Sequence, residues 1–289
     1  QQTGGPGIAL EQQTSADRVV DQLKFMLAIQ EGDDSTVDEL LNQGVDVEQK
    51  TEFGRNSPLI LAAQNGHEKV VSALLIANAA VNKLHNDGYS ALHFAVQYGN
   101  KKVVDVLLEN KADVTQVDEN GLTPLMNASL YGYEEIVVDL LEKKADVNQL
   151  NPDQSVALHF ATQNANEEVV CILLEAKADV NKRDKNGQTA LMIAAEHGHV
   201  EVVKALMKAG AEVDLEIGGI ALIGGIALIG GISFRGISFR GISFRGISFK
   251  RIAGIIRKKT ESYEELLIKA ATKAREELIE TALNAQGQE

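Results

Sequence analysis

The chain contains few of the residues that build irregular cores and covalent cross-links. Its 289 residues include no tryptophan, only 4% aromatic residues and a single cysteine, Cys171. One cysteine excludes an internal disulfide framework and fits a reducing compartment, so we expect a cytoplasmic protein, with the nucleus as an alternative. Because 44% of the residues are hydrophobic, a core is still available, and we expect small aliphatic side chains to fill it.

The first residues lack the features of a secretory signal. The stretch QQTGGPGIALEQQTSAD has no initiating methionine, no basic region and no long apolar run, so we expect no signal peptide there. We expect residues 1–17 to form a disordered N-terminal segment. The missing methionine also leaves open that the chain is a fragment of a longer protein.

Positive charge is scarce except in one region. The net charge is −13. Residues 217–259 hold eight Lys and Arg residues and no acidic residue, so the rest of the chain carries a net charge of −21. We therefore expect no nucleic-acid partner for the molecule as a whole. The asymmetry suggests a basic arm on an acidic body.

Five 19-residue segments recur in the middle of the chain. They are SPLILAAQNGHEKVVSALL, SALHFAVQYGNKKVVDVLL, TPLMNASLYGYEEIVVDLL, VALHFATQNANEEVVCILL and TALMIAAEHGHVEVVKALM, which start at Ser57, Ser90, Thr123, Val156 and Thr189. Each starts 33 residues after the previous one, and a weaker copy starts at Leu23. A fixed period of this length is typical of a protein whose repeats stack on their neighbours.

The apolar spacing within each copy predicts two helices. Leu92, Ala95 and Val96 lie at i, i+3 and i+4, and residues 103–108 supply a second apolar face. Thr123 opens its copy in front of a proline, which is a helix-start signal because threonine caps and proline fits the first helical position. A glycine then separates the two helices in most copies, and Asp-Gly or Asn-Gly pairs mark hairpin turns.

This pattern resembles the ankyrin repeat over residues 18–217, with six repeats of which the first is atypical. The copies share the middle alanine, and most of them also have the T/S-x-L start, the Leu-Leu pair and a tail close to A-D-V-N. The resemblance implies an all-α repeat solenoid in which each repeat contributes two antiparallel helices and a projecting hairpin loop. The repeats would stack into a curved array.

Several positions depart from the family pattern. Asn78, Lys111, Lys144 and Lys177 stand at the end of the second helix, where the family usually has glycine. We expect each to hold a positive φ at a cost of about 1 kcal/mol relative to glycine. The fifth repeat also has Ala165 in place of the inter-helix glycine and Asp153-Gln154 at its hairpin, so its tip is expected to differ.

The terminal repeats need outer faces that are polar or covered. The stretch QEGDDSTVDE, residues 30–39, predicts a polar face for the first repeat. The last repeat ends with the apolar stretch VVKALM, residues 202–207. We therefore expect a downstream segment to cover that end.

No stretch of the sequence forms a catalytic constellation, so we predict a protein that is not an enzyme and uses no cofactor and no metal. There is no phosphate loop, nucleophile elbow or Cys/His metal spacing. The EHGH stretch at 196–199 crosses a turn instead of one helical face, which argues against zinc. Cys171 is expected to be a partly exposed, unreactive thiol. By the resemblance, His93 and His159 tie neighbouring loops together through hydrogen bonds.

We predict that the repeats bind a protein partner through the concave groove and the hairpin tips, the surfaces that the resemblance implies. Tyrosine is enriched among interface anchors, and the tip and helix-end carboxylates of Asp87, Glu119, Asp153 and Glu196 make a basic peptide segment plausible. The alternative is that the tyrosines only pack between repeats. The predicted contact residues are Gln64, Asn65, Tyr89, Gln97, Tyr98, Leu122, Leu130, Tyr131, Gln163, Asn164, Glu196 and His197.

Residues 218–259 form a tandem-repeat segment rich in Gly, Ile, Phe and Arg, and four interpretations stay open for it. Residues 217–234 are long and apolar enough to span a membrane, but six of the eighteen are glycine. The repeated units IGGIAL and ISFRG also fit a short β-solenoid. The basic residues could bind an acidic groove or anionic lipid. The last interpretation is a segment without designed structure.

Residues 260–285 are expected to form an amphipathic C-terminal helix. Ser262 and Glu265 have the spacing of a capping box, and Tyr263, Leu267 and Leu278 lie at helical spacing. The sequence as a whole predicts an interaction scaffold or adaptor. The rival prediction is a membrane-associated adaptor that residues 217–259 anchor.

Overall fold

The computed structural model describes residues 15–48 and 57–212. The predicted basic segment at 218–259 and the C-terminal helix at 260–285 lie outside the described residues. The N-terminal prediction is partly wrong, because the first helix already begins at Ser15, inside the segment 1–17 expected to be disordered. Asp17 lies in the first turn of that helix, where a carboxylate is favoured by the helix dipole.

The described residues form paired helices and no strand, and the chain divides into two compact units, residues 1–147 and 148–289. Unit 1 contains α1 (Ser15–Glu31), α2 (Asp34–Asn42), α3 (Pro58–Asn65), α4 (Glu68–Ile76), α5 (Ala91–Gln97), α6 (Lys101–Glu109), α7 (Pro124–Tyr131) and α8 (Glu134–Glu142). Unit 2 contains α9 (Ala157–Gln163), α10 (Glu167–Glu175), α11 (Ala190–His197) and α12 (Val200–Lys208).

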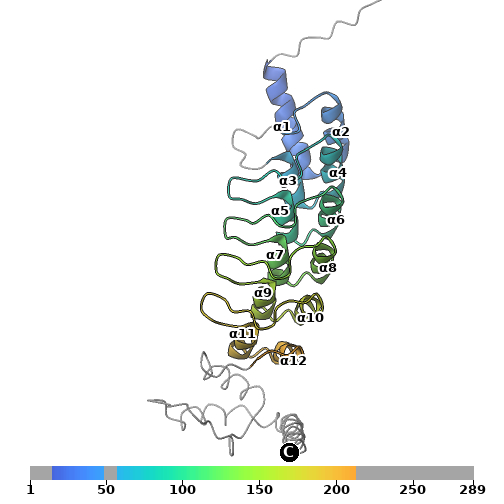
Figure 1. The fold of residues 1–289 in the computed structure, drawn as a ribbon. Helices are drawn as coiled ribbons and strands as arrows, with labels where there is room; N and C mark the ends of the chain where they lie inside the picture. The colour runs from blue at the N-terminus through green and yellow to red at the C-terminus, as the bar shows by residue number, and fades with distance from the viewer. Residues whose placement is uncertain (1–14, 49–56, 213–289) are drawn as a thin grey trace, which may run out of the picture. The chain divides into compact units, whose positions relative to one another are not determined.

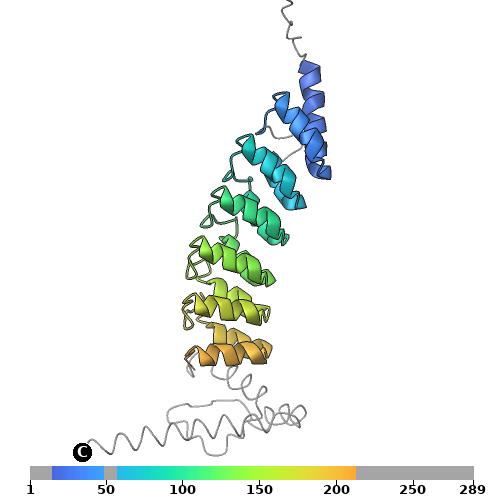
Figure 2. The same ribbon diagram turned by 90° about the vertical axis from the view of Figure 1, so that its right-hand side faces the viewer.

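Within each unit the helix pairs stack on one another, odd helix against odd and even helix against even (Figures 1 and 2). The loops that join successive pairs project beside the odd-numbered helices, away from the even-numbered ones (Figure 1). This arrangement confirms the predicted all-α repeat solenoid of helix, turn, helix and hairpin.

Small and aliphatic side chains fill the core, as the composition predicts. In unit 1, Ala62, Ala95 and Ala128 are completely buried at the same place in successive odd-numbered helices. Their small size lets the helices approach closely. Leu74 and Leu107 are equally buried on the even-numbered helices. Each pair therefore buries its apolar faces against its neighbours, which is why a single repeat would not be stable alone.

Side-chain caps start most odd-numbered helices. The Thr123 hydroxyl accepts a hydrogen bond from the Met126 N–H at 3.2 Å, and Pro124 occupies the first helical position. Thr189 caps α11 in the same way through the Met192 N–H. These bonds satisfy N–H groups that a helix start would otherwise leave without an acceptor. The Thr-Pro helix-start prediction is therefore confirmed.

An acidic or amide side chain organises most hairpin loops from within. The Asp118 carboxylate accepts hydrogen bonds from the N–H groups of Asn120 and Leu122, at 2.9 and 2.8 Å. In unit 2, Asp184 does the same for Asn186 and Gln188, both at 2.8 Å. Because one side chain holds both arms of the loop, each tip is a preorganised structure.

The departures from the family pattern keep the family backbone. Asn78, Lys111, Lys144 and Lys177 have φ values of 65°, 64°, 67° and 69°, which confirms the expected left-handed conformation. The expectation for the fifth repeat was wrong. Gln154 has φ 58° and donates its N–H to the Asn151 carbonyl, as Gly121 does to Asp118, so the loop keeps the same turn. The packing of the helix pairs imposes this geometry on residues that do not favour it.

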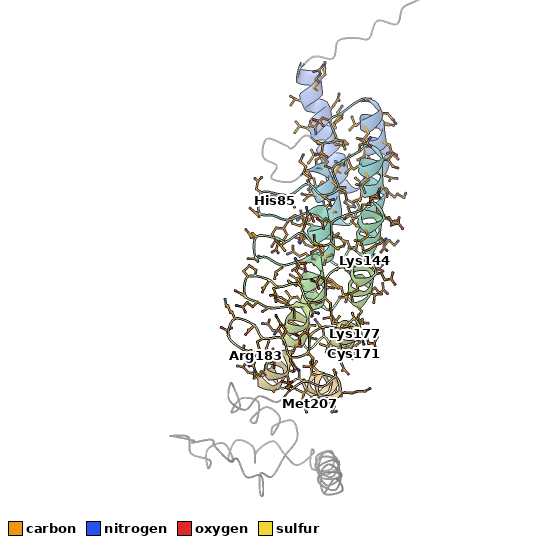
Figure 3. The ribbon with its side chains drawn as sticks, in the orientation of Figure 1. His85, Lys144, Cys171, Lys177, Arg183 and Met207 are labelled. Carbon is orange, nitrogen blue, oxygen red and sulfur yellow. The ribbon has the colours of Figure 1, made fainter. Side chains whose placement is uncertain are left out.

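The two ends of the repeat array differ from expectation. The stretch 30–39 is polar at its surface, as predicted, but α1 exposes Val19, Val20, Leu23 and Leu27, each between 48% and 61%. In the last pair, Val202, Val203 and Leu206 are buried and Met207 is 45% exposed. Met207, which Figure 3 labels, is thus the exposed large apolar residue of α12, and the downstream segment expected to cover this end lies outside the described residues.

Candidate functional site

The ends of α5 and α7 place two tyrosines on the surface of unit 1. Tyr98 is 52% exposed and Tyr131 is 45% exposed, and they occupy the same position in successive repeats. The Tyr98 hydroxyl accepts a hydrogen bond from the Gln64 amide at 3.3 Å. This bond joins the end of α3 to the end of α5. Tyr98 is therefore held in place while its ring stays accessible.

Tyr131 packs against a neighbouring aromatic ring. It stacks on Tyr133 with the ring centroids 5.8 Å apart and an interplanar angle of 28°. Tyr133 in turn lies against Gly99, where an added Cβ would come within 2.9 Å of the tyrosine ring. Gly99 therefore leaves room for this contact, and glycine also adopts its φ of 66° without steric cost. Tyr133 acts as a support, and Tyr131 presents its ring to solvent.

Tyr89 and Leu122, two further predicted contact residues, belong to the hairpins before α5 and α7. Tyr89 packs on Phe94, with ring centroids 5.2 Å apart, and lies edge-on to His93. Burial, followed by the charge of Asp118, raises the pKa of its phenol. The Leu122 carbonyl accepts a hydrogen bond from His93 at 3.2 Å. Both residues are half-buried parts of the hairpin framework, so here the alternative of packing between repeats fits the geometry better.

The other predicted contact residues of unit 1 occupy equivalent positions at the ends of α3, α5 and α7. Asn65 is exposed at the end of α3, and Gln64, Gln97 and Leu130 are half-buried. They follow the same helix ends as Tyr98 and Tyr131. Together these helix ends form one candidate contact surface of unit 1.

Sequence reasoning missed an exposed aliphatic position on the hairpins. In unit 1, Leu84 is 44% exposed and Val117 is 41% exposed, one residue before His85 and Asp118 respectively. Leu150 stands at the same place in unit 2 and is 45% exposed, and Arg183 follows at the next copy. Aligning the copies beyond the 19-residue segments would have revealed this signal. Figure 3 shows His85 on the hairpin side of unit 1 and Arg183 on the hairpin side of unit 2.

In unit 2 the predicted contact residues also lie at the helix ends. Gln163, Asn164, Glu196 and His197 are all exposed. Glu196 accepts a hydrogen bond from the Gln188 amide at 3.0 Å, and the His197 ring stacks on His199 at 5.5 Å. His199 is itself fixed by the Gln163 carbonyl, which accepts a hydrogen bond from its Nε2 at 3.2 Å. His199 therefore has a structural role, because it joins two successive repeats.

Most of the carboxylates that suggested a basic partner have partners inside the fold. Asp87 lies 3.2 Å from the His85 ring, and Asp153 forms a 2.7 Å ion pair with Lys185. Glu196 accepts the Gln188 hydrogen bond described above. Each would have to exchange an existing contact for one with a ligand. These contacts weaken the case for a basic peptide.

The described residues hold no group of three or more His, Cys, Asp or Glu residues that could bind a metal ion. Cys171 is exposed on α10, and burial followed by the nearby Glu167 raises the pKa of its thiol, so the thiolate is disfavoured. Within residues 15–48 and 57–212, no helix has both the length and the apolar character needed to cross a membrane.

Comparisons with known proteins agree with this architecture. A family model for ankyrin repeats, built on three copies, matches residues 25–118 and again residues 125–217, more than half of the chain. The chain therefore belongs to the ankyrin-repeat family. It is similar to the crystal structure of the human ASB11 ankyrin repeat domain, with 29% identity and a TM-score of 0.60. That match covers 66% of this chain and 85% of the other. A search of curated proteins found no match.

Proposed function

We propose that this protein is a protein-interaction scaffold whose principal contact surface is the set of helix ends that carries Tyr98 and Tyr131. Ankyrin repeats generally act as non-enzymatic modules that bind other proteins. The observation that carries the proposal is the exposure of these two rings, 52% and 45%, at equivalent positions of unit 1. Neither ring is needed to fill the core. Tyr98 is held by the Gln64 side chain and Tyr131 by the Tyr133 ring.

The support matters for affinity. The Gln64 hydrogen bond and the Tyr133 stack hold Tyr98 and Tyr131 in fixed positions before any partner arrives. A rigid aromatic anchor loses little conformational entropy on binding. Tyrosine also offers both an apolar ring and a hydroxyl, which is why it recurs among residues that dominate interface energies. Leu84 and Val117 would add aliphatic contacts from the hairpins of the same unit.

The partner we propose is a protein segment that contributes apolar and aromatic side chains. A basic segment, as the sequence suggested, remains a narrower proposal that rests on Asp87, Glu119, Asp153 and Glu196. The two differ in salt dependence, because screening weakens contacts between exposed charges and leaves apolar contacts largely unchanged. Binding that falls steeply with added salt would favour the basic segment over the apolar one.

Binding to lysate proteins tests the site. The double variant Tyr98→Ala plus Tyr131→Ala should lose partner binding by at least about tenfold, as expected for aromatic anchors. The matched control is Ile76→Ala plus Val138→Ala, which removes two exposed apolar side chains from the even-numbered helices of the same unit. Circular dichroism should show both variants folded. If the tyrosine variant binds as tightly as the control, the proposed site is wrong.

The rival proposal is a membrane-associated adaptor anchored by residues 217–259. It rests on the sequence of that segment, which lies outside the described residues. Flotation with liposomes that contain anionic lipid, using the full chain, tests it directly. Recovery of the chain only in the non-floating fraction at low salt would remove this proposal.

A further inference from the structure

Helices α5 and α9 begin with the same histidine but with different residues before it. The two starts read SALH from Ser90 and VALH from Val156. In both, the histidine Nδ1 accepts a hydrogen bond from the N–H of the residue that precedes the helix, at 3.2 Å. The two starts therefore form a natural pair that differs mainly by one hydroxyl group.

Both ring nitrogens of His159 form hydrogen bonds, and its side chain has almost no contact with solvent. It is 4% exposed. Its Nδ1 accepts from the Val156 N–H, and its Nε2 donates toward the carbonyls of Lys182 and Gln188, at 3.1 and 3.3 Å. This pattern requires a neutral imidazole with its proton on Nε2, because only an unprotonated Nδ1 can accept. Val156 offers no side-chain cap, so the histidine supplies the side-chain acceptor at this helix start.

His93 has the same arrangement plus one additional partner. The Ser90 hydroxyl lies 2.9 Å from its Nδ1, and the Leu122 carbonyl accepts from its Nε2 at 3.2 Å. While the ring is neutral, the hydroxyl can donate to Nδ1. Once the ring is protonated, the same oxygen can accept from Nδ1–H, because a hydroxyl rotates to suit its neighbour. A protonated His93 therefore keeps a partner for each of its two ring N–H groups, and only the Ser90 backbone N–H loses its acceptor.

We propose that His159 makes the start of α9 an acid-sensitive element that opens when the ring is protonated, whereas the Ser90 hydroxyl protects the start of α5 from the same change. In α9, the new Nδ1–H would point at the Val156 N–H, which leaves two buried donors facing each other. A buried donor without an acceptor is costly, and a buried charge more so. Opening the helix start hydrates both groups.

Burial and one equivalent aspartate act on the pKa of both rings. Burial is the main cause that lowers the pKa of both histidines, and Asp184 opposes it for His159 as Asp118 does for His93. Those two aspartates occupy equivalent hairpin positions. The titratable groups on the helices of unit 2 packed against α9 are Glu167, Glu168, Cys171, Glu175, Glu196 and His197, none of them buried. The Ser-to-Val difference therefore separates the two sites.

The direction of the pH effect follows from linkage. A histidine whose folded pKa lies below its unfolded value of about 6.5 binds its proton more readily in the unfolded state. The stability it contributes is present above that unfolded pKa and is lost as the pH falls through the folded pKa. Both histidines contribute in this direction. The proposal is that the loss of stability is larger and more local at α9, because the Nδ1–H of protonated His159 has no acceptor there.

Hydrogen exchange of the full chain, read by mass spectrometry, tests the proposal. Protection of residues 157–163 is compared with that of residues 91–97 at about pH 7.5 and about pH 5.5, after correction for intrinsic exchange rates. We expect protection of α9 to fall at least about tenfold more than that of α5, within the pH range where histidine titrates. Parallel losses in the two helices would overturn the proposal.

Exchanging the preceding residues sharpens the test. Val156→Ser should give His159 an acceptor and remove the excess acid sensitivity of α9, whereas Ser90→Val should transfer it to α5. If Val156→Ser leaves the pH response of α9 unchanged, the proposal fails even where Ser90→Val does not fold. His159→Met provides a separate check, because methionine occupies this place in α7 and α11 as Met126 and Met192. That variant should abolish the pH-dependent part of exchange in α9.

Discussion

The helix pairs α7/α8 and α9/α10 share a backbone but differ in the residues that would normally specify it. The first has Gly121 and Gly132 at positive φ, 72° and 75°, and Thr123 as a cap. The second reaches the same conformations with Gln154 at 58° and Ala165 at 56°, and Val156 supplies no side-chain cap. Local sequence favours the structure strongly in one pair and opposes it in the other.

The comparison shows that packing overrides local preference in this fold. In α9/α10, Ala161, Val170 and Leu173 are completely buried, as Ala128, Val137 and Leu140 are in α7/α8. Burial of these aliphatic side chains offsets the cost of a strained loop, because each contributes on the order of 1–3 kcal/mol. The cost does not vanish, so α9/α10 should be the less stable pair locally. Three sets of substitutions test this conclusion, in order of expected effect.

The largest effect is expected at the cap of α7. Thr123→Val should lower the free energy of unfolding by about 1–2 kcal/mol, because the buried Met126 N–H loses its acceptor. The reverse change, Val156→Thr, should stabilise by less, since the His159 N–H that the new hydroxyl would cap already donates to the Val156 carbonyl at 3.0 Å. Urea unfolding of the full chain followed by circular dichroism measures both. Equal and opposite changes would show that this carbonyl contact does not substitute for a side-chain cap.

A smaller effect is expected at the hairpin before α9. Gln154→Gly should raise the free energy of unfolding by about 1 kcal/mol, because glycine adopts a positive φ without steric cost. Lys144→Gly and Lys177→Gly are the controls, since the two pairs have the same residue and nearly the same φ there, 67° and 69°. Those two changes should give equal gains. A neutral Gln154→Gly would mean that the loop carries no strain.

The smallest effect is expected inside α9. The Thr162 hydroxyl is buried and has no hydrogen-bond partner, whereas Ser129, at the same place in α7, donates to the Leu125 carbonyl at 2.7 Å. Thr162→Val keeps the shape and removes the polar group, so it should stabilise by up to about 1 kcal/mol. Ser129→Ala should be destabilising instead. Thermal unfolding resolves the sign of both changes in stability. A destabilising Thr162→Val would contradict the interpretation that the Thr162 hydroxyl lacks a hydrogen-bond partner.

The sequence predicted the repeat period, the helix pairs and the caps, because these follow from short-range patterns. It also placed the positive φ at Lys111 and Lys144 correctly, since the helix must end there whichever residue is present. It failed at the hairpin of Gln154, where it expected a different tip. Local preference was the only information available at that position, and the packed neighbours decided the result.

For the candidate site, too, the sequence showed the residue types and the structure decided their exposure. Tyrosine at positions 89, 98 and 131 was visible in the sequence, but its exposure was not. Tyr89 turns onto Phe94, whereas Tyr98 and Tyr131 stay accessible at their helix ends. Nothing in the sequence marked Leu84 and Val117 as exposed, and the structure places them at the surface of the hairpins. Exposure depends on what the neighbouring repeat covers, and that is a property of the stack.

By itself, then, the sequence determined that this chain builds an ankyrin-repeat array, since a 33-residue period of apolar faces can be buried only by stacking. The tertiary structure decided which residues carry strain, which tyrosines face solvent and which hydrogen bonds each histidine makes. The sequence shows a serine before one histidine and a valine before the other, but only the structure places the Ser90 hydroxyl 2.9 Å from the His93 Nδ1. The physical reason is that hydrogen bonding and burial depend on distances that the repeat pattern does not contain.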